Sequence, residues 1–310
     1  MASQAPRVAL LLSIGLLGLW FLRALLIRLR QAARRRSAWA PSTETSVTGF
    51  VTTFFDTLGI GNFATTTTIF RTWRLVPDEL IPGTLNVGHS IAAVLGAFIF
   101  IGLVPVTSET LLPTIVASGL GAWLGSGVVA RLPRYQIRLG MGTALLVAAT
   151  VMLLTQLQWL PGGGEALGLQ GWRWTVALLG NFVLGSLMTL GIGLYAPCLI
   201  LVSLLGMNPI AAFPIMMGSC AMLMPVATLR FIRDRKYDLR AALGLALGGI
   251  PAVLLAAYVV HSLPLTWLRW LVVIIVLYAA ALMLLSARAK PPIADISPAV
   301  PERAADSSHR

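Results

Sequence analysis

The chain has little charge and little cysteine. Of its 310 residues only 11% are charged and 57% are hydrophobic, with a mean hydropathy of +0.84. Average soluble domains carry about 25% charged residues, so this composition excludes an ordinary soluble protein. The two cysteines, Cys198 and Cys220, both lie in apolar segments, and neither has a second cysteine at metal-ligand spacing. We therefore expect no disulfide framework, no metal site and no cofactor.

Acidic residues are much scarcer than basic ones. The chain has 11 Asp and Glu against 23 Lys and Arg, a formal net charge of +12. No basic face or aromatic-basic module accompanies this excess, so nucleic-acid binding is not indicated. Membrane proteins gather Lys and Arg in their cytoplasmic loops. We therefore expect the lipid bilayer, and no nucleic acid, as the partner of this chain.

Long apolar runs recur along the chain and predict an all-α polytopic membrane protein. The first run, near residues 8–28, is followed by five arginines between 28 and 36, the reverse of a cleavable signal peptide. We expect an uncleaved helix with its N-terminus outside. The predicted organisation is a membrane anchor and basic linker (1–46), a first transmembrane repeat (47–160), a second transmembrane repeat (174–287) and a disordered C-terminal tail (288–310).

Two near-copies of one motif support the division into repeats. Residues 57–64 read TLGIGNFA and residues 189–196 read TLGIGLYA, so six of eight positions are identical at an offset of 132. At the same offset Pro77 corresponds to Pro209, and Pro82 to Pro214. Matching interrupted hydrophobic segments in two halves are a sequence indication of a transporter's binding site.

The apolar block 174–205 is too long for a simple span. Its 32 residues would reach about 48 Å as a straight helix, against a hydrocarbon core of about 30 Å. If each Gly-containing block is a re-entrant hairpin, 20 basic residues fall inside and 3 outside; if each crosses the membrane, the tally is 16 against 7. The positive-inside rule favours hairpins. Three further spans per half then make the two repeats inverted.

Candidate site residues cluster at the two Gly turns. A helix that starts within the membrane presents unpaired N–H groups and a partial positive charge, which suit an anion. The alternative is helix packing through small residues. The candidate substrate-binding residues at the turns are Gly59, Gly61, Asn62, Thr65 and Thr66 in the first copy, and Gly191, Gly193, Tyr195, Ala196 and Pro197 in the second.

Asp56 is the one acidic residue well inside an apolar block. A carboxylate there costs about 2.5–3.5 kcal/mol on insertion scales, so it needs a role. Two roles are open: coupling of transport to a proton or cation, or bonding of backbone N–H groups at the broken helix. Asn86 and His89 share one helix face, and Ser219 lies in the corresponding segment of the second half. They are candidates for a cavity wall, or for interhelical hydrogen bonds.

No enzyme is predicted. An aspartyl intramembrane protease needs two buried aspartates, and no nucleophile-elbow context surrounds any serine. The segments YAPCLILVSLLGMNPIAAFPIMMGSCA (195–221) and FIRDRKYDL (231–239), with the duplicated Gly turns, resemble the TauE/SafE-type sulfite exporter family of membrane permeases. This resemblance covers about residues 45–287. It implies a bacterial inner-membrane permease for sulfite, organosulfonates or related sulfur anions.

The sequence thus predicts a secondary transporter of a small anion, with its N-terminus outside and its C-terminus in the cytoplasm. A channel or a carrier for another small solute such as a carboxylate stays open, as does a non-transporting membrane protein. Direction of transport, coupling ion and oligomeric state are not determined by the sequence.

Overall fold

The computed structural model describes residues 5–34, 40–125, 134–157, 164–188 and 194–288. Within these ranges the regular elements are helices, and the one β-type contact is an isolated bridge between Ala166 and Met207. The prediction of an all-α protein is confirmed. The α-helices are α1 (Ala5–Arg34), α2 (Thr43–Thr57), α3 (Asn62–Thr72), α4 (Ile81–Leu103), α5 (Ser108–Leu120), α7 (Arg134–Gln156), α8 (Gly171–Met188), α9 (Tyr195–Leu204), α10 (Ala212–Asp234), α11 (Leu239–Ser262) and α12 (Leu265–Arg288). Short 3₁₀ segments, η1 (Asp78–Leu80) and η3 (Pro209–Ala211), precede α4 and α10, and a π-helical turn, η2 (Gly121–Gly125), continues α5.

Four of the helices in the described ranges are long and apolar enough to cross a membrane. They are α1, α4 with η1, α10 with η3, and α11. The three other expected spans correspond to α5, α7 and α12. The helix α5 has 13 α-helical residues before the π-helical turn. In α7 and α12 the most apolar stretches, residues 142–154 and 269–282, are shorter than the helices themselves.

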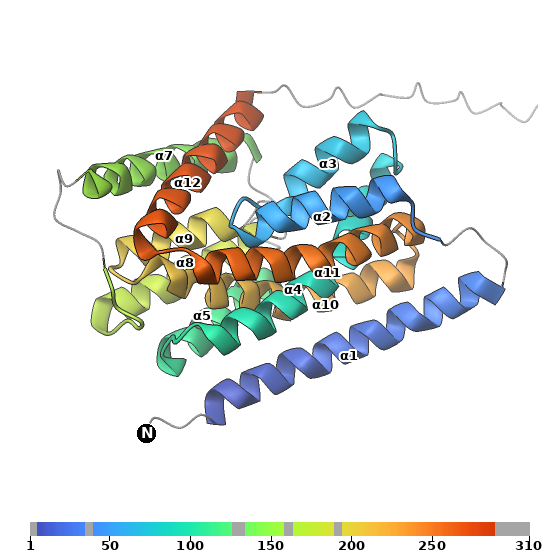
Figure 1. The fold of residues 1–310 in the computed structure, drawn as a ribbon, viewed down its shortest axis with the longest axis horizontal. Helices are drawn as coiled ribbons and strands as arrows, with labels where there is room; N and C mark the ends of the chain where they lie inside the picture. The colour runs from blue at the N-terminus through green and yellow to red at the C-terminus, as the bar shows by residue number, and fades with distance from the viewer. Residues whose placement is uncertain (1–4, 35–39, 126–133, 158–163, 189–193, 289–310) are drawn as a thin grey trace, which may run out of the picture.

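The helices α2 and α3 form a hairpin whose two outer ends lie together. A side chain on Gly244, near the start of α11, would meet Thr45 at the start of α2. Phe70, near the end of α3, packs in a buried cluster with Ala241 and Leu245, also at the start of α11. The chain therefore enters through α2, breaks near Gly59 and returns through α3 to the end from which it came (Figure 1).

The helices α8 and α9 form a second hairpin. Arg173, in the first turn of α8, reaches the carbonyl of Leu205 just beyond the end of α9. The backbone N–H of Asn208 donates to Ala166 O at 2.9 Å, which ties the segment after α9 to the segment before α8. In Figure 1 the outer ends of the two hairpins lie at opposite ends of the bundle.

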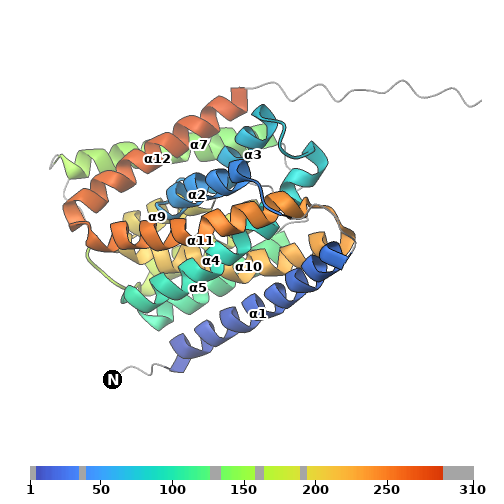
Figure 2. The same cartoon turned by 45° about the vertical axis from the view of Figure 1, so that its right-hand side comes forward.

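The two halves of the chain pack through matching helix pairs. The helices α4 and α10 run antiparallel: Phe100 stacks on Phe213 with ring centroids 5.1 Å apart, and Ser90 shares a 3.0 Å hydrogen bond with Thr228. The first helix of each hairpin packs on the other half, α2 on α11 and α8 on α5. The helices α7 and α12 pair at one side of the bundle, opposite α1 (Figure 2).

The first helix is fixed across the α4–α10 pair at both of its ends. Arg7 donates to the carbonyls of Ile101 and Val104 at the end of α4, and Arg28 donates to Ile232 O near the end of α10 at 3.1 Å. Basic side chains at helix C-termini satisfy unpaired carbonyls and oppose the negative end of the helix dipole. These contacts fix α1 against helices of both halves.

Candidate functional site

The turn between α2 and α3 is built by glycine. Gly59 has φ +112° and Gly61 has φ +86°, a backbone conformation that L side chains rarely adopt. A Cβ on Gly59 would lie 2.6 Å from Leu199 Cδ1 of α9, whereas a Cβ on Gly61 would meet no atom of the described residues within 4 Å. The turn of the first hairpin therefore contacts the second hairpin at Gly59 and borders open space at Gly61.

Asp56 is held at this turn by the first residue of α3. The Asn62 side-chain amide donates to Asp56 Oδ2 at 3.1 Å, and Asn62 itself is buried. Gly59 N–H donates to the Asp56 carbonyl at 2.8 Å, which closes the end of α2. Three residues further on, Gly59 lies against Leu199 of the second half. Asp56 therefore lies where the two halves meet.

His89 joins the two legs of the first hairpin. Its Nδ1 lies 3.2 Å from Thr53 Oγ1 on α2, and its Nε2 lies 3.4 Å from Thr66 Oγ1 on α3. All three side chains are buried. Because both ring nitrogens bond to hydroxyls, His89 makes the interhelical hydrogen bonds that its buried position requires.

The second hairpin returns through α9. Tyr195, Ala196 and Pro197 form its first turn and are buried, and no side chain caps its N-terminus. The Tyr195 hydroxyl donates to Met217 Sδ at 3.4 Å. Gly191 and Gly193 lie outside the described residues. The described part of this turn thus offers backbone N–H groups and a tyrosine hydroxyl.

Sulfur atoms surround the start of α9. Cys198 Sγ lies 3.7 Å from Asn181 Oδ1 on α8, and Cys220 Sγ on α10 lies 3.9 Å from Met188 Sδ at the end of α8. A thiol is a weak donor and a thioether a weak acceptor, so these contacts hold the second hairpin less firmly than the His89 hydrogen bonds hold the first.

The remaining predicted site residues, Thr65, Asn86 and Ser219, differ in their hydrogen bonds. The Thr65 hydroxyl donates within its own helix to Asn62 O at 3.0 Å, and the Asn86 amide donates to Pro82 O at 2.8 Å on α4. Asn86 therefore has no hydrogen bond to either hairpin among the described residues. Ser219 is fully buried on α10, and its hydroxyl has no hydrogen-bond partner within the described ranges.

Residues 174–307 match the family described as sulfite exporter TauE/SafE. The match covers 134 of the 310 residues, in the second part of the chain. The resemblance expected from segment 195–221 is thereby confirmed over the second hairpin and the helices α10 to α12. No curated protein and no solved structure gives a match to the chain.

Sequence reasoning missed several residues of this centre, in both halves of the chain. Asn181 is a buried amide in the middle of an apolar block, and this polar interruption was a visible signal. Thr53 and Met217 gave no signal, because single threonines and methionines are common in membrane helices. Within the described ranges no group of three His, Cys, Asp or Glu side chains is placed to hold a metal ion.

Proposed function

We propose that the protein is a secondary permease that moves a small anion, with sulfite, an organosulfonate or a related sulfur anion as the substrate, across a bacterial inner membrane. The observation that carries this proposal is the meeting of the two hairpins: Gly59 of the first lies against Leu199 of the second, beside Asp56. The match of residues 174–307 to a family of sulfite exporters supports the substrate class.

An anion would bind at the helix starts that face the centre. The helix α3 begins after Gly61 and α9 begins after Leu194, and neither N-cap residue supplies a side-chain hydrogen bond to its helix. Free N–H groups and the positive end of the helix dipole together favour an anion. The open space beside Gly61 supports the same position.

We further propose that both hairpins are re-entrant and enter from opposite faces of the membrane, as in an inverted repeat. The packing of α2 on α11 and of α8 on α5 supports this arrangement, since each pair joins the broken helix of one half to the corresponding helix of the other half. The N-terminus would then lie outside and the C-terminus in the cytoplasm. Alternating access would proceed by rocking one half against the other.

Asp56 would couple transport to a proton or a cation. A bound anion at the start of α3 would repel the ionised Asp56 carboxylate, because Asn62 joins that carboxylate to the same helix start. Protonation of Asp56, or a cation beside it, removes the repulsion. Anion binding and uptake of a proton or cation would therefore favour each other.

The proposal is tested by uptake into proteoliposomes that contain the full chain. Sulfite, an alkane sulfonate and a simple carboxylate are each offered outside, with the unlabelled anion trapped inside for counterflow. We expect saturable counterflow of sulfite or the sulfonate, with loss in Gly61→Leu, whose side chain would fill the open space. Gly102→Leu, near the end of α4, is the control for added bulk, because a Cβ there also meets no described atom within 4 Å, and Gly61→Ala is the control for strain at the positive φ of Gly61.

Two outcomes would contradict this function. Uptake of the carboxylate alone would favour a carrier of another class of solute, and non-saturable flux without counterflow would favour a channel. Normal sulfite counterflow by the Gly61→Leu variant would place the anion site elsewhere in the protein.

A further inference from the structure

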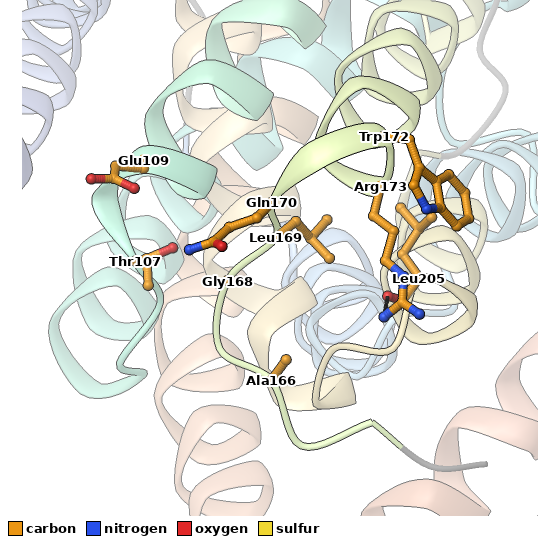
Figure 3. Close-up of a pocket in the computed structure, with 9 residues that line it drawn as sticks. All are labelled: Thr107, Glu109, Ala166, Gly168, Leu169, Gln170, Trp172, Arg173 and Leu205. Atoms are coloured by element: carbon orange, nitrogen blue, oxygen red, sulfur yellow. Dashed lines mark hydrogen bonds between the residues drawn. The ribbon is translucent and has the colours of Figure 1, made fainter. Parts of the chain in front are cut away.

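A pocket of about 450 Å³ opens at the outer end of the second hairpin, away from the turn. Figure 3 shows its lining residues, which come from the start of α5, the segment that leads into α8, the first turn of α8, and the end of α9. The 18 residues of α8 span roughly 27 Å at 1.5 Å per residue. This pocket is therefore separate from the centre at the far end of α8.

The walls of the pocket are fixed by hydrogen bonds. Thr107 N–H donates to Leu167 O at 2.9 Å, and Leu169 N–H donates to Thr110 Oγ1 at 2.9 Å. On the α8 side, Trp174 Nε1 donates to the backbone carbonyl of Glu109 at 2.9 Å. A cavity held in this way exists before a ligand arrives, as in most small-molecule sites.

The charge of the pocket favours an anion at one of its sides. Arg173 is the sole Lys or Arg among the nine lining residues. Its guanidinium lies 5.8 Å from the Trp172 ring centroid and has a marginal contact of 3.5 Å with Leu205 O. The first turn of α8 contains no acidic residue, so its N–H groups add to the positive potential.

The other polar lining groups define the opposite side. In Figure 3 the Gln170 amide extends toward Thr107, while Glu109 turns its carboxylate away from Gln170. Glu109 is the one acidic side chain in the lining. It lies in the first turn of α5, where it opposes that helix's positive end. Its charge weakens anion binding in the pocket without blocking the Arg173 side.

We propose that this pocket is a second anion-binding site, at which Arg173 and the first turn of α8 hold a small oxyanion at the outer mouth of the protein. The inference rests on the proposed function for its role, the capture or release of the transported anion. The site itself is defined by the pocket and its charges.

Trp172 provides a direct measurement of occupancy. It lines the pocket and is 69% exposed, so iodide can quench its fluorescence. The difference between the intact chain and Trp172→Phe isolates its signal from the other tryptophans. We expect sulfite and sulfate each to protect Trp172 from iodide. Arg173→Gln should weaken protection about tenfold or more, because it removes a charged hydrogen-bond donor to the anion, and Glu109→Gln should strengthen protection.

The control is Arg269→Gln, which removes a second arginine outside the pocket lining. Protection that survives Arg173→Gln, or that falls equally in both arginine variants, would overturn the proposal. The proteoliposome assay keeps the two proposals distinct. Sulfite transport without protection of Trp172 would refute the outer site alone, and protection without transport of any sulfur anion would refute the proposed function alone.

Discussion

The two hairpins share a backbone plan and differ in chemistry. In the first, a histidine bonds both legs through Thr53 and Thr66, and a carboxylate bonds the amide at the start of the returning helix. In the second, the described side-chain contacts near the start of α9 are weaker ones that involve sulfur, those of Cys198 and Cys220, while hydrogen bonds of Arg173 and Asn208 tie the outer end of the hairpin. Among the described residues, the histidine and the carboxylate that bond at the turn therefore belong to the first hairpin.

This difference indicates that the two hairpins have different roles in transport. Buried hydrogen bonds to the first hairpin hold its two legs in a fixed relation, and Asp56 gives it a group that can change charge. The second hairpin has no acidic residue at the corresponding position, where Met188 stands. We expect the first hairpin to carry coupling, and the second to contribute helix-start N–H groups and packing.

The largest expected effect is on folding, through the close helix packing that both hairpins share. Gly248 of α11 lies against the Ser46 carbonyl of α2, and Gly185 of α8 lies against the Ser118 carbonyl of α5, with no room for a Cβ. Valine at either position would force the helices apart, so we expect loss of folded protein in both variants. Size-exclusion profiles in detergent measure this. Gly119→Val, at an open position on α5, should remain folded. A folded Gly248→Val or Gly185→Val protein would contradict the close packing of that pair.

The next effect concerns Asp56, whose counterpart in the second hairpin is Met188. Asp56→Asn keeps the size of the side chain and its capacity for hydrogen bonds but cannot ionise. We expect it to abolish gradient-driven accumulation of the anion in proteoliposomes and to spare counterflow exchange. A purely structural aspartate predicts either unfolded protein or no change in either assay. Normal gradient-driven uptake by the Asn variant would remove the coupling role.

A smaller effect is expected on thermal stability, when the buried contacts that hold each hairpin are removed in turn. His89→Ala leaves two buried hydroxyls without their partner, at a cost of roughly 1–3 kcal/mol each before they find new acceptors, so it should lower the thermal midpoint clearly. Cys220→Ala removes one sulfur contact and should cost about 1 kcal/mol. Thermal unfolding in detergent compares the two variants, and His261→Ala, exposed near the end of α11, is the control. Equal losses for His89→Ala and Cys220→Ala would contradict the stronger hold on the first hairpin.

The helices could be predicted from the sequence more easily than the side-chain contacts between them. Uninterrupted apolar runs and the break at Gly59–Gly61 predicted helical segments, because hydropathy and glycine act locally. Asp56 could be singled out because a carboxylate in an apolar run is costly. Its partner Asn62 could be placed at the turn, but the bond between them depends on how the chain folds back. The pairing of His89 with Thr53 and Thr66 joins three helices, and no local pattern in the sequence encodes it.

The central claim is that the two hairpins enter from opposite faces of the membrane. Trp73, just after α3, is 58% exposed, and Trp172, at the start of α8, is 69% exposed. Single cysteines at these positions, in a chain with Cys198 and Cys220 replaced by alanine, can be labelled in intact cells with a membrane-impermeant maleimide. We expect labelling at position 172, and none at position 73 until the membrane is opened. Labelling of both positions from the same face would contradict it.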